Sequence, residues 1–235
     1  MAPRANVSAA LAFGPFVALL AWLSIGSTIA VFTALPSSNV VSSVEAQLPR
    51  PASEVRAAAA DNIRAAGWFD GSRYRLHAAR SLLALPASLS VREQASIEQL
   101  TRASLSAAPM SSYGWTLLSF LRFQRGDVAG ATRAWEMSVL VGRYVPNLMQ
   151  SRLLLGVKIL RYDRGLADEV VDQVRVLAKG DPASLARTAR NGGLEAPFRA
   201  ILAGSEQSEP FELATRALVS TARSRLRQPL AKAKP

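Results

Sequence analysis

The sequence predicts an all-α protein that carries one membrane-spanning helix near its N-terminus. Three observations predict this fold class: Ala, Leu, Arg and Ser dominate the composition, runs of β-branched residues are few, and helix-capping signals recur along the chain. The length of 235 residues is enough for one globular domain beside a membrane segment. Cysteine is absent, which excludes disulfides, thiolate metal sites and cysteine nucleophiles.

The N-terminal segment is a long apolar run. No ionisable residue occurs from Val7 to Leu35. The densest part, Phe16 to Leu35, would cross a hydrocarbon core of about 30 Å as a helix. Because a cleavable signal peptide has an apolar region of only ~7–15 residues, we expect an uncleaved signal-anchor helix. Cleavage after Ala46 is the alternative that the sequence leaves open.

The charges on either side of this run predict its orientation. The amino terminus and Arg4 precede it, whereas Arg50 is the one basic residue within about 20 residues after it. The positive-inside bias therefore favours a cytoplasmic N-terminus and a periplasmic body. We expect a single-pass protein of the bacterial inner membrane.

Composition also predicts how the rest of the chain is divided. The expected segments are a short cytoplasmic N-terminus at 1–6, a transmembrane helix at 7–35, a Ser/Val-rich linker at 36–52, an α-helical repeat-like domain at 53–228 and a basic tail at 229–235. Within the domain, Ser90 and Glu93 have the spacing of a capping box and predict a helix start.

A helical hairpin is predicted between Ser111 and Gly142. Ser111 and Ser112 are helix N-cap types, and the pair Gly126-Asp127 is a turn signal between two helical runs. The second run carries a stripe of apolar and small residues at three- and four-residue steps, namely Val128, Ala131, Trp135 and Ser138. The small side chain of Ala131 would let the two helices approach closely.

This hairpin resembles a tetratricopeptide repeat. The matching positions are Pro109, Trp115, Leu118, Ser119, Gly126, Asp127, Ala131 and Trp135. Arg122 and Arg143 depart from the pattern, which usually has Tyr and Pro there. A weaker copy follows 39 residues later with Leu154, Val157, Gly165, Val170, Val174 and Pro182, so that the resemblance covers about 111–182. The alternative is an ordinary helical hairpin with the same packing needs.

The resemblance implies a stack of helical hairpins with a groove lined by the first helix of each. The groove-facing positions would be Tyr113, Thr116, Phe120, Phe123, Arg152, Leu155, Ile159 and Tyr162. The first four are largely aromatic, which suits an apolar helix or an extended peptide from an unidentified protein partner. The alternative is that neighbouring helices of the same chain cover these aromatic side chains.

The charge distribution suggests a second kind of partner. The net charge is +11, and after Glu212 the chain has no acidic residue. The basic positions singled out in this tail are Arg223, Arg225, Arg227, Lys232 and Lys234. They would contact an anionic lipid or polysaccharide, unless they form only a solvated C-terminus. Nucleic acid is not expected as a partner, because no zinc-finger or RNA-recognition motif is present.

No constellation of catalytic residues is recognisable, and we expect a protein that is not an enzyme and uses no cofactor or metal. Dinucleotide, phosphate-binding, metalloprotease and serine-hydrolase motifs are all missing, and His77 is the single histidine. The expected function is a protein–protein interaction scaffold at the bacterial cell envelope. In style the chain is similar to anchored helical-repeat proteins that are accessory to envelope polysaccharide synthesis or export.

Overall fold

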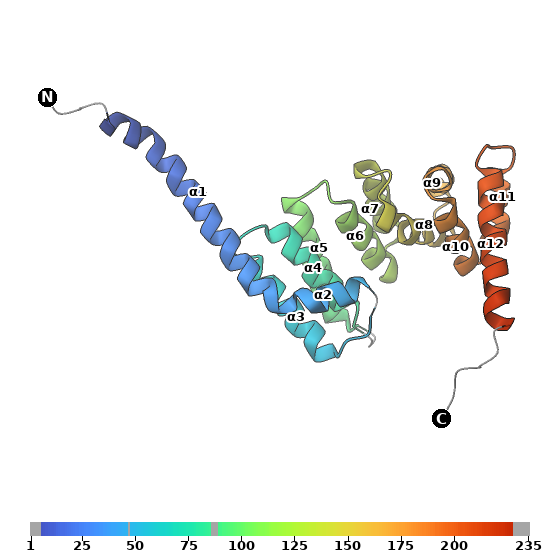
Figure 1. Ribbon diagram of the computed structural model, residues 1–235, viewed down its shortest axis with the longest axis horizontal. Coiled ribbons are helices and arrows are strands. Elements are labelled where there is room, and N and C mark those ends of the chain that lie inside the picture. The colour runs from blue at the N-terminus through green and yellow to red at the C-terminus, as the bar shows by residue number, and fades with distance from the viewer. Residues whose placement is uncertain (1–5, 47, 86–88, 228–235) are drawn as a thin grey trace. The chain divides into compact units, whose positions relative to one another are not determined.

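The computed structural model describes residues 6–46, 48–85 and 89–227, and within them every regular element is a helix (Figure 1). The all-α prediction is therefore confirmed. The chain forms two compact units, Met1–Met110 and Ser111–Pro235. The range 53–228, predicted as one domain, is shared between these two units.

The first unit is built around a long apolar helix and a three-helix body. Its elements are α1 (Asn6–Ala34), the short 3-10 helix η1 (Leu35–Ser37), α2 (Ser38–Glu45), α3 (Ala52–Ala65), α4 (Gly71–Leu83) and α5 (Val91–Ala107). Helix α4 packs between α3 and α5, and α3 also contacts α1 and α2. One stretch of the part described with side chains, Gly14–Val44, is long and apolar enough to cross a membrane.

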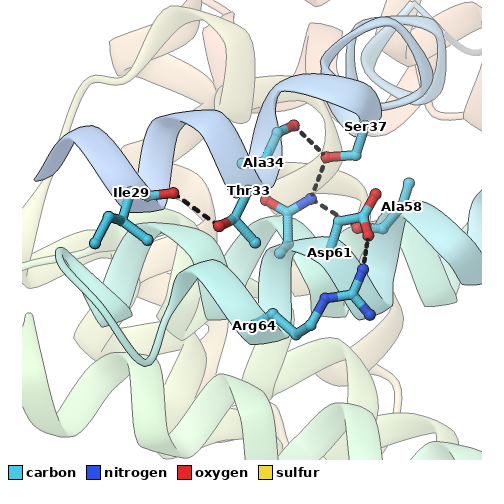
Figure 2. A network of polar contacts seen from close by, with 8 residues as sticks. Ile29, Thr33, Ala34, Ser37, Ala58, Asp61 and Arg64 are labelled. Atoms are coloured by element: carbon cyan, nitrogen blue, oxygen red, sulfur yellow. Dashed lines mark hydrogen bonds and ion pairs between the residues drawn. The ribbon is translucent and has the colours of Figure 1, made fainter. Parts of the chain in front are cut away.

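The stretch predicted as a linker is largely helical. Residues 36–45 belong to η1 and α2, and α2 contacts both α3 and α4. Ser42 and Ser43 satisfy their hydroxyls by donating to backbone carbonyls four residues earlier, which makes a Ser-rich segment compatible with a helix. Buried Ser37 accepts a 3.0 Å hydrogen bond from Asn62 of α3 (Figure 2). Tertiary contacts of this kind override the weak helix propensity of the segment.

Capping signals in the sequence predicted helix starts well in both units. Ser90 and Glu93 form the reciprocal capping box at the start of α5. Ser111 accepts a hydrogen bond from the Gly114 amide and begins α6, and Asp127 does the same with Gly130 at α7. Gly126 adopts a φ of 81° in the turn between these two helices, a conformation that favours glycine. The predicted hairpin is thus present.

The second unit continues this hairpin as a stack of helices. Its elements are α6 (Ser112–Gln124), α7 (Val128–Val141), α8 (Pro146–Leu160), η2 (Arg164–Leu166), α9 (Ala167–Gly180), α10 (Pro182–Gly192), α11 (Glu195–Leu202) and α12 (Ser208–Arg227). Helices α6, α8 and α10 contact one another in succession and form a first layer, while α7, α9 and α12 pack against them. Leu185, Phe198 and Phe211 extend the core through the last three helices.

Candidate partner-binding face

The structure places the eight predicted groove residues in different environments. Thr116, Arg152, Leu155 and Ile159 are buried in the interior, so they are not available to a partner. Tyr113, Phe120 and Phe123 are half-buried on α6, and Tyr162 is 71 % exposed just after α8. The expectation that α8 presents residues 152, 155 and 159 outward is therefore corrected.

The rotation of α8 about its axis explains why residues 152, 155 and 159 are buried. The helix buries a stripe formed by Leu148, Met149, Arg152, Leu153, Leu155, Gly156 and Ile159. Its opposite side presents Ser151, Lys158, Arg161 and Tyr162, with Leu154 half-buried among them. Leu154 and Val157, which the weak repeat copy aligned with inward residues, are thus only partly covered, whereas Val170 and Val174 of α9 are buried as expected.

Trp135 determines the rotation of α8. Its indole is fully buried, and its Nε1–H donates a 2.8 Å hydrogen bond to the backbone carbonyl of Arg152. Gly156 lies against the same ring, because a Cβ at this position would come within 2.7 Å of the indole. The large aromatic side chain of α7 and the missing side chain on α8 therefore fit together in one orientation only.

Arg152 is a buried arginine that joins three helices. Its guanidinium donates to the carbonyls of Ser138, Gly142 and Arg143 at the C-terminal end of α7, over 2.7–3.0 Å. It also donates to the side chain of Gln173 on α9, 2.6 Å away. Burial lowers the pKa of Arg152 to about 10, so the side chain is still cationic at neutral pH. A cation is favourable here because the carbonyl end of a helix carries partial negative charge.

An aromatic pair connects α6 with the end of α8. The rings of Phe123 and Tyr162 lie 5.9 Å apart in an edge-to-face arrangement. Because α6 contacts α8 and α8 contacts α10, we group the exposed and half-buried side chains on these helices and just after α8 under the name first-helix face. It consists of Tyr113, Phe120, Phe123, Leu154, Lys158, Arg161, Tyr162, Arg187 and Arg190.

The charged side chains assigned to the first-helix face are all basic, although Asp181 at the start of α10 interacts with Arg187. Helices α6, α8 and α10 contain no Asp or Glu, whereas α7, α9 and α12 carry Glu136, Asp168, Glu169, Asp172, Glu209 and Glu212. Lys158, Arg161 and Arg190 are exposed, and within the described residues none of them forms an ion pair. Arg187 donates to Ser184 on its own helix. The acidic side chains of these six helices are therefore confined to α7, α9 and α12, which also carry seven basic residues, namely Arg133, Arg175, Lys179, Arg216, Arg223, Arg225 and Arg227.

These basic residues were not singled out from the sequence. The recognisable signal was two pairs of cations three residues apart, Lys158 and Arg161 at the end of α8 and Arg187 and Arg190 on α10. Such pairs lie on one side of a helix. The weak repeat copy assigned the neighbouring residues of α8 to the surface, and α10 was not included in the groove.

One carboxyl group on α7 has a perturbed pKa. Partial burial raises the pKa of Glu136, and the charges of Glu169 and Asp163 raise it further. Asp163 also accepts a hydrogen bond from Thr132. No group of three or more His, Asp or Glu side chains that could hold a metal ion occurs in the searched part of the chain, which is the described part.

A separate pocket lies in the first unit, at the C-terminal end of α1. Its volume is about 310 Å³, and its polar lining comes from Ser37, Ser38, Ser42, Asn62, Arg73, Tyr74 and His77. None of its lining residues is an Asp or Glu. His77 is half-buried and faces this pocket from α4. The lining supplies hydrogen-bond donors and no pair of carboxyl groups for acid–base chemistry.

The basic residues singled out near the C-terminus are only partly described. Arg223, Arg225 and Arg227 belong to the last turns of α12, but the description of this segment covers its backbone alone. Lys232 and Lys234 lie outside the described residues.

Comparison with protein-family models finds no match for this chain, and no curated protein matches it either.

Proposed function

We propose that this protein is a membrane-anchored interaction scaffold of the bacterial cell envelope that binds an acidic protein segment on its first-helix face. One observation carries the proposal: the three adjacent helices of this face contain basic residues and no acidic residue, whereas α7, α9 and α12 contain six acidic residues among seven basic ones. A basic face with exposed Tyr162 and half-buried aromatic side chains beside it is complementary to an acidic peptide or helix with apolar anchors.

The two components of the face have different roles in this proposal. Tyr162 and Phe123 supply the apolar contact area, since aromatic side chains contribute much of the binding energy at interfaces. Lys158, Arg161 and Arg190 attract the acidic partner and select its orientation. Exposed charges of this kind act chiefly on the association rate and on the salt dependence of binding.

The anchoring part of the proposal concerns α1. Its apolar length supports a single membrane crossing, and the flanking charges favour a cytoplasmic N-terminus. In this arrangement both units lie in the periplasm at the inner membrane. The protein itself performs no catalysis in this proposal but holds its partner near the membrane surface. An accessory role in polysaccharide synthesis or export is one setting for such a scaffold.

Reversing two charges on the first-helix face tests the proposal. We expect the full-length Lys158→Glu/Arg161→Glu variant to recover at least about tenfold less of its specific partner from native membranes, because like charges then face each other. The matched control is Arg133→Glu/Arg175→Glu, which reverses two exposed charges on α7 and α9. Equal recovery by both variants, with unchanged helicity in circular dichroism, would contradict the proposal.

The basic C-terminus supports a second candidate function, the binding of an anionic polymer or lipid. Five basic residues and no acidic residue lie between 223 and 235. We expect deletion of 223–235 to leave partner recovery unchanged if the first-helix face is the binding surface. Loss of salt-sensitive binding to an anionic polysaccharide in the same variant would instead favour the second function. Residues 208–222 are retained because Phe211 and Thr215 are buried in the unit.

A further inference from the structure

Helix α1 consists of two parts with different surroundings. From Gly14 to Ile25 every residue is exposed, so no other element of the described chain covers this part. From Gly26 onwards one side of the helix packs on the body of the first unit, where Ala30 is completely buried. A Cβ at Gly26 would lie 3.0 Å from the backbone oxygen of Trp68. The surroundings of α1 therefore change from fully exposed to partly covered at the level of Gly26.

Helix α3 runs alongside this second part of α1 in the opposite direction. At one level Asn62 donates to Ser37, and at the other the Trp68 carbonyl lies beside Gly26 (Figure 2 shows the Ser37 end). The turn between α3 and α4 thus points along α1 towards its fully exposed part. Asp70 holds this turn with a φ of 44° and caps α4 by accepting a hydrogen bond from the Arg73 amide.

The tip of this turn exposes two consecutive aromatic side chains. Trp68 is 55 % exposed and Phe69 40 %, and Ile63 on the last turn of α3 is exposed as well. Arg64 lies between them in the sequence, paired with Asp61 and also exposed (Figure 2). Exposed aromatic residues with an arginine nearby are typical of the zone where a protein meets lipid headgroups.

The position of the tip restricts where a bilayer can surround α1. A span over Phe16–Leu35, the densest apolar part, would put Gly26 and the adjoining turn at the middle of the hydrocarbon. Asp70 would then be near the bilayer centre, where a charged side chain costs ~2.5–3.5 kcal/mol or more. A span over residues 6–25 avoids this cost. It has 20 residues and a length of about 30 Å, enough to cross the hydrocarbon core.

We propose that the turn at Trp68 and Phe69 inserts into the headgroup layer beside α1, so that the hydrocarbon ends at Gly26 and begins near Asn6. The occupant of this surface is the lipid bilayer itself, because the tip is continuous with the fully exposed apolar surface of α1. The turn acts as a stop that determines how deeply the protein sits and how the first unit is oriented above the membrane. The inference rests on the proposed anchoring by α1.

The absence of cysteine makes a clean test possible, since any introduced cysteine is unique. Single variants Phe16→Cys, Ile25→Cys and Phe69→Cys of the full-length chain would carry a nitroxide label in vesicles of phosphatidylethanolamine and phosphatidylglycerol. Each of these side chains is exposed. Collision rates with oxygen, which concentrates in lipid, and with a nickel chelate, which stays in water, report the depth of each label. Val91→Cys, at an 81 % exposed position of α5, is the water control.

We expect the label at 16 to be the deepest of the three. The labels at 25 and 69 should share a shallow depth, with a ratio of oxygen to nickel collision rates that is severalfold above that of the water control. A maximum at 25, or a label at 69 that is as accessible to nickel as that at 91, would overturn the inference while anchoring stands. Water accessibility at 16, 25 and 69 alike would overturn the anchoring and the inference with it. Trp68→Cys provides a second label in the turn, and circular dichroism checks the helicity of each variant.

Discussion

Replacing Arg152 with methionine is expected to lower the free energy of unfolding of the second unit by about 3–5 kcal/mol, the range found when one partner of a buried charged network is removed. Methionine is about as long as the aliphatic part of arginine and keeps the apolar contacts of that part. It leaves the carbonyls of Ser138, Gly142 and Arg143 without the donor that the folded structure provides. Each buried polar group without a partner costs about 1–3 kcal/mol.

Arg143→Met is the matched control for this prediction. Arg143 forms an exposed ion pair with Asp172, and exposed pairs contribute about 0–1 kcal/mol. Denaturant unfolding of the full-length variants in detergent, followed by tryptophan fluorescence, measures the two changes. Hydrogen exchange over α7–α9 assigns the loss to the second unit. Equal effects of the two substitutions would mean that the hydrogen bonds of Arg152 do not support the stack.

Trp135→Ala is expected to cost about 3–5 kcal/mol, because it empties the centre of the interface between α7 and α8. The indole is fully buried and belongs to the main core cluster, and its N–H bond to the Arg152 carbonyl is lost as well. Leu140→Ala on the same helix is the control, since Leu140 is largely exposed. The comparison uses the midpoint and slope of denaturant unfolding for each variant.

Substitutions at Gly156 test the contact between α7 and α8 more specifically. Gly156→Ala alone should be destabilising by about 1–3 kcal/mol, since the added methyl group has no room beside the indole. In a Trp135→Leu background this methyl group enters space that the indole has left, and the cost of Gly156→Ala should largely disappear. A double-mutant cycle measures the coupling. Additive effects would show that the two residues do not define the rotation of α8.

The helix boundaries of this chain were largely predictable from local signals. Ser90 with Glu93, Ser111 and Asp127 each begin a helix where their side chains indicated, because N-caps satisfy amides only a few residues away. The 36–45 segment was the main exception. Its serines and Pro36 suggested a linker, yet contacts with α3 and α4 hold it in a helical conformation.

The candidate site was predictable only in part. Local pattern identified the aromatic residues of α6, since the first hairpin has strong packing signals. The orientation of α8 was predicted wrongly, because the repeat pattern was given more weight than the polar residues Asn147, Ser151 and Lys158, which share the exposed side, and because the buried cation Arg152 looks like a surface residue. Arginine is rarely buried unless hydrogen bonds satisfy it, and here those bonds come from α7 and α9, which are distant in sequence.

From the amino-acid sequence alone follow the all-α class, the long apolar helix, the first hairpin and the missing cysteine chemistry, because composition, periodicity and capping act over a few residues. Only the tertiary structure decided the division after Met110, the burial of Arg152 and the packing of α6, α8 and α10, which lack acidic residues, next to one another. It also decided that the α3–α4 turn lies beside Gly26. These features depend on which helices pack together and at what rotation, and side chains far apart in the sequence determine that choice.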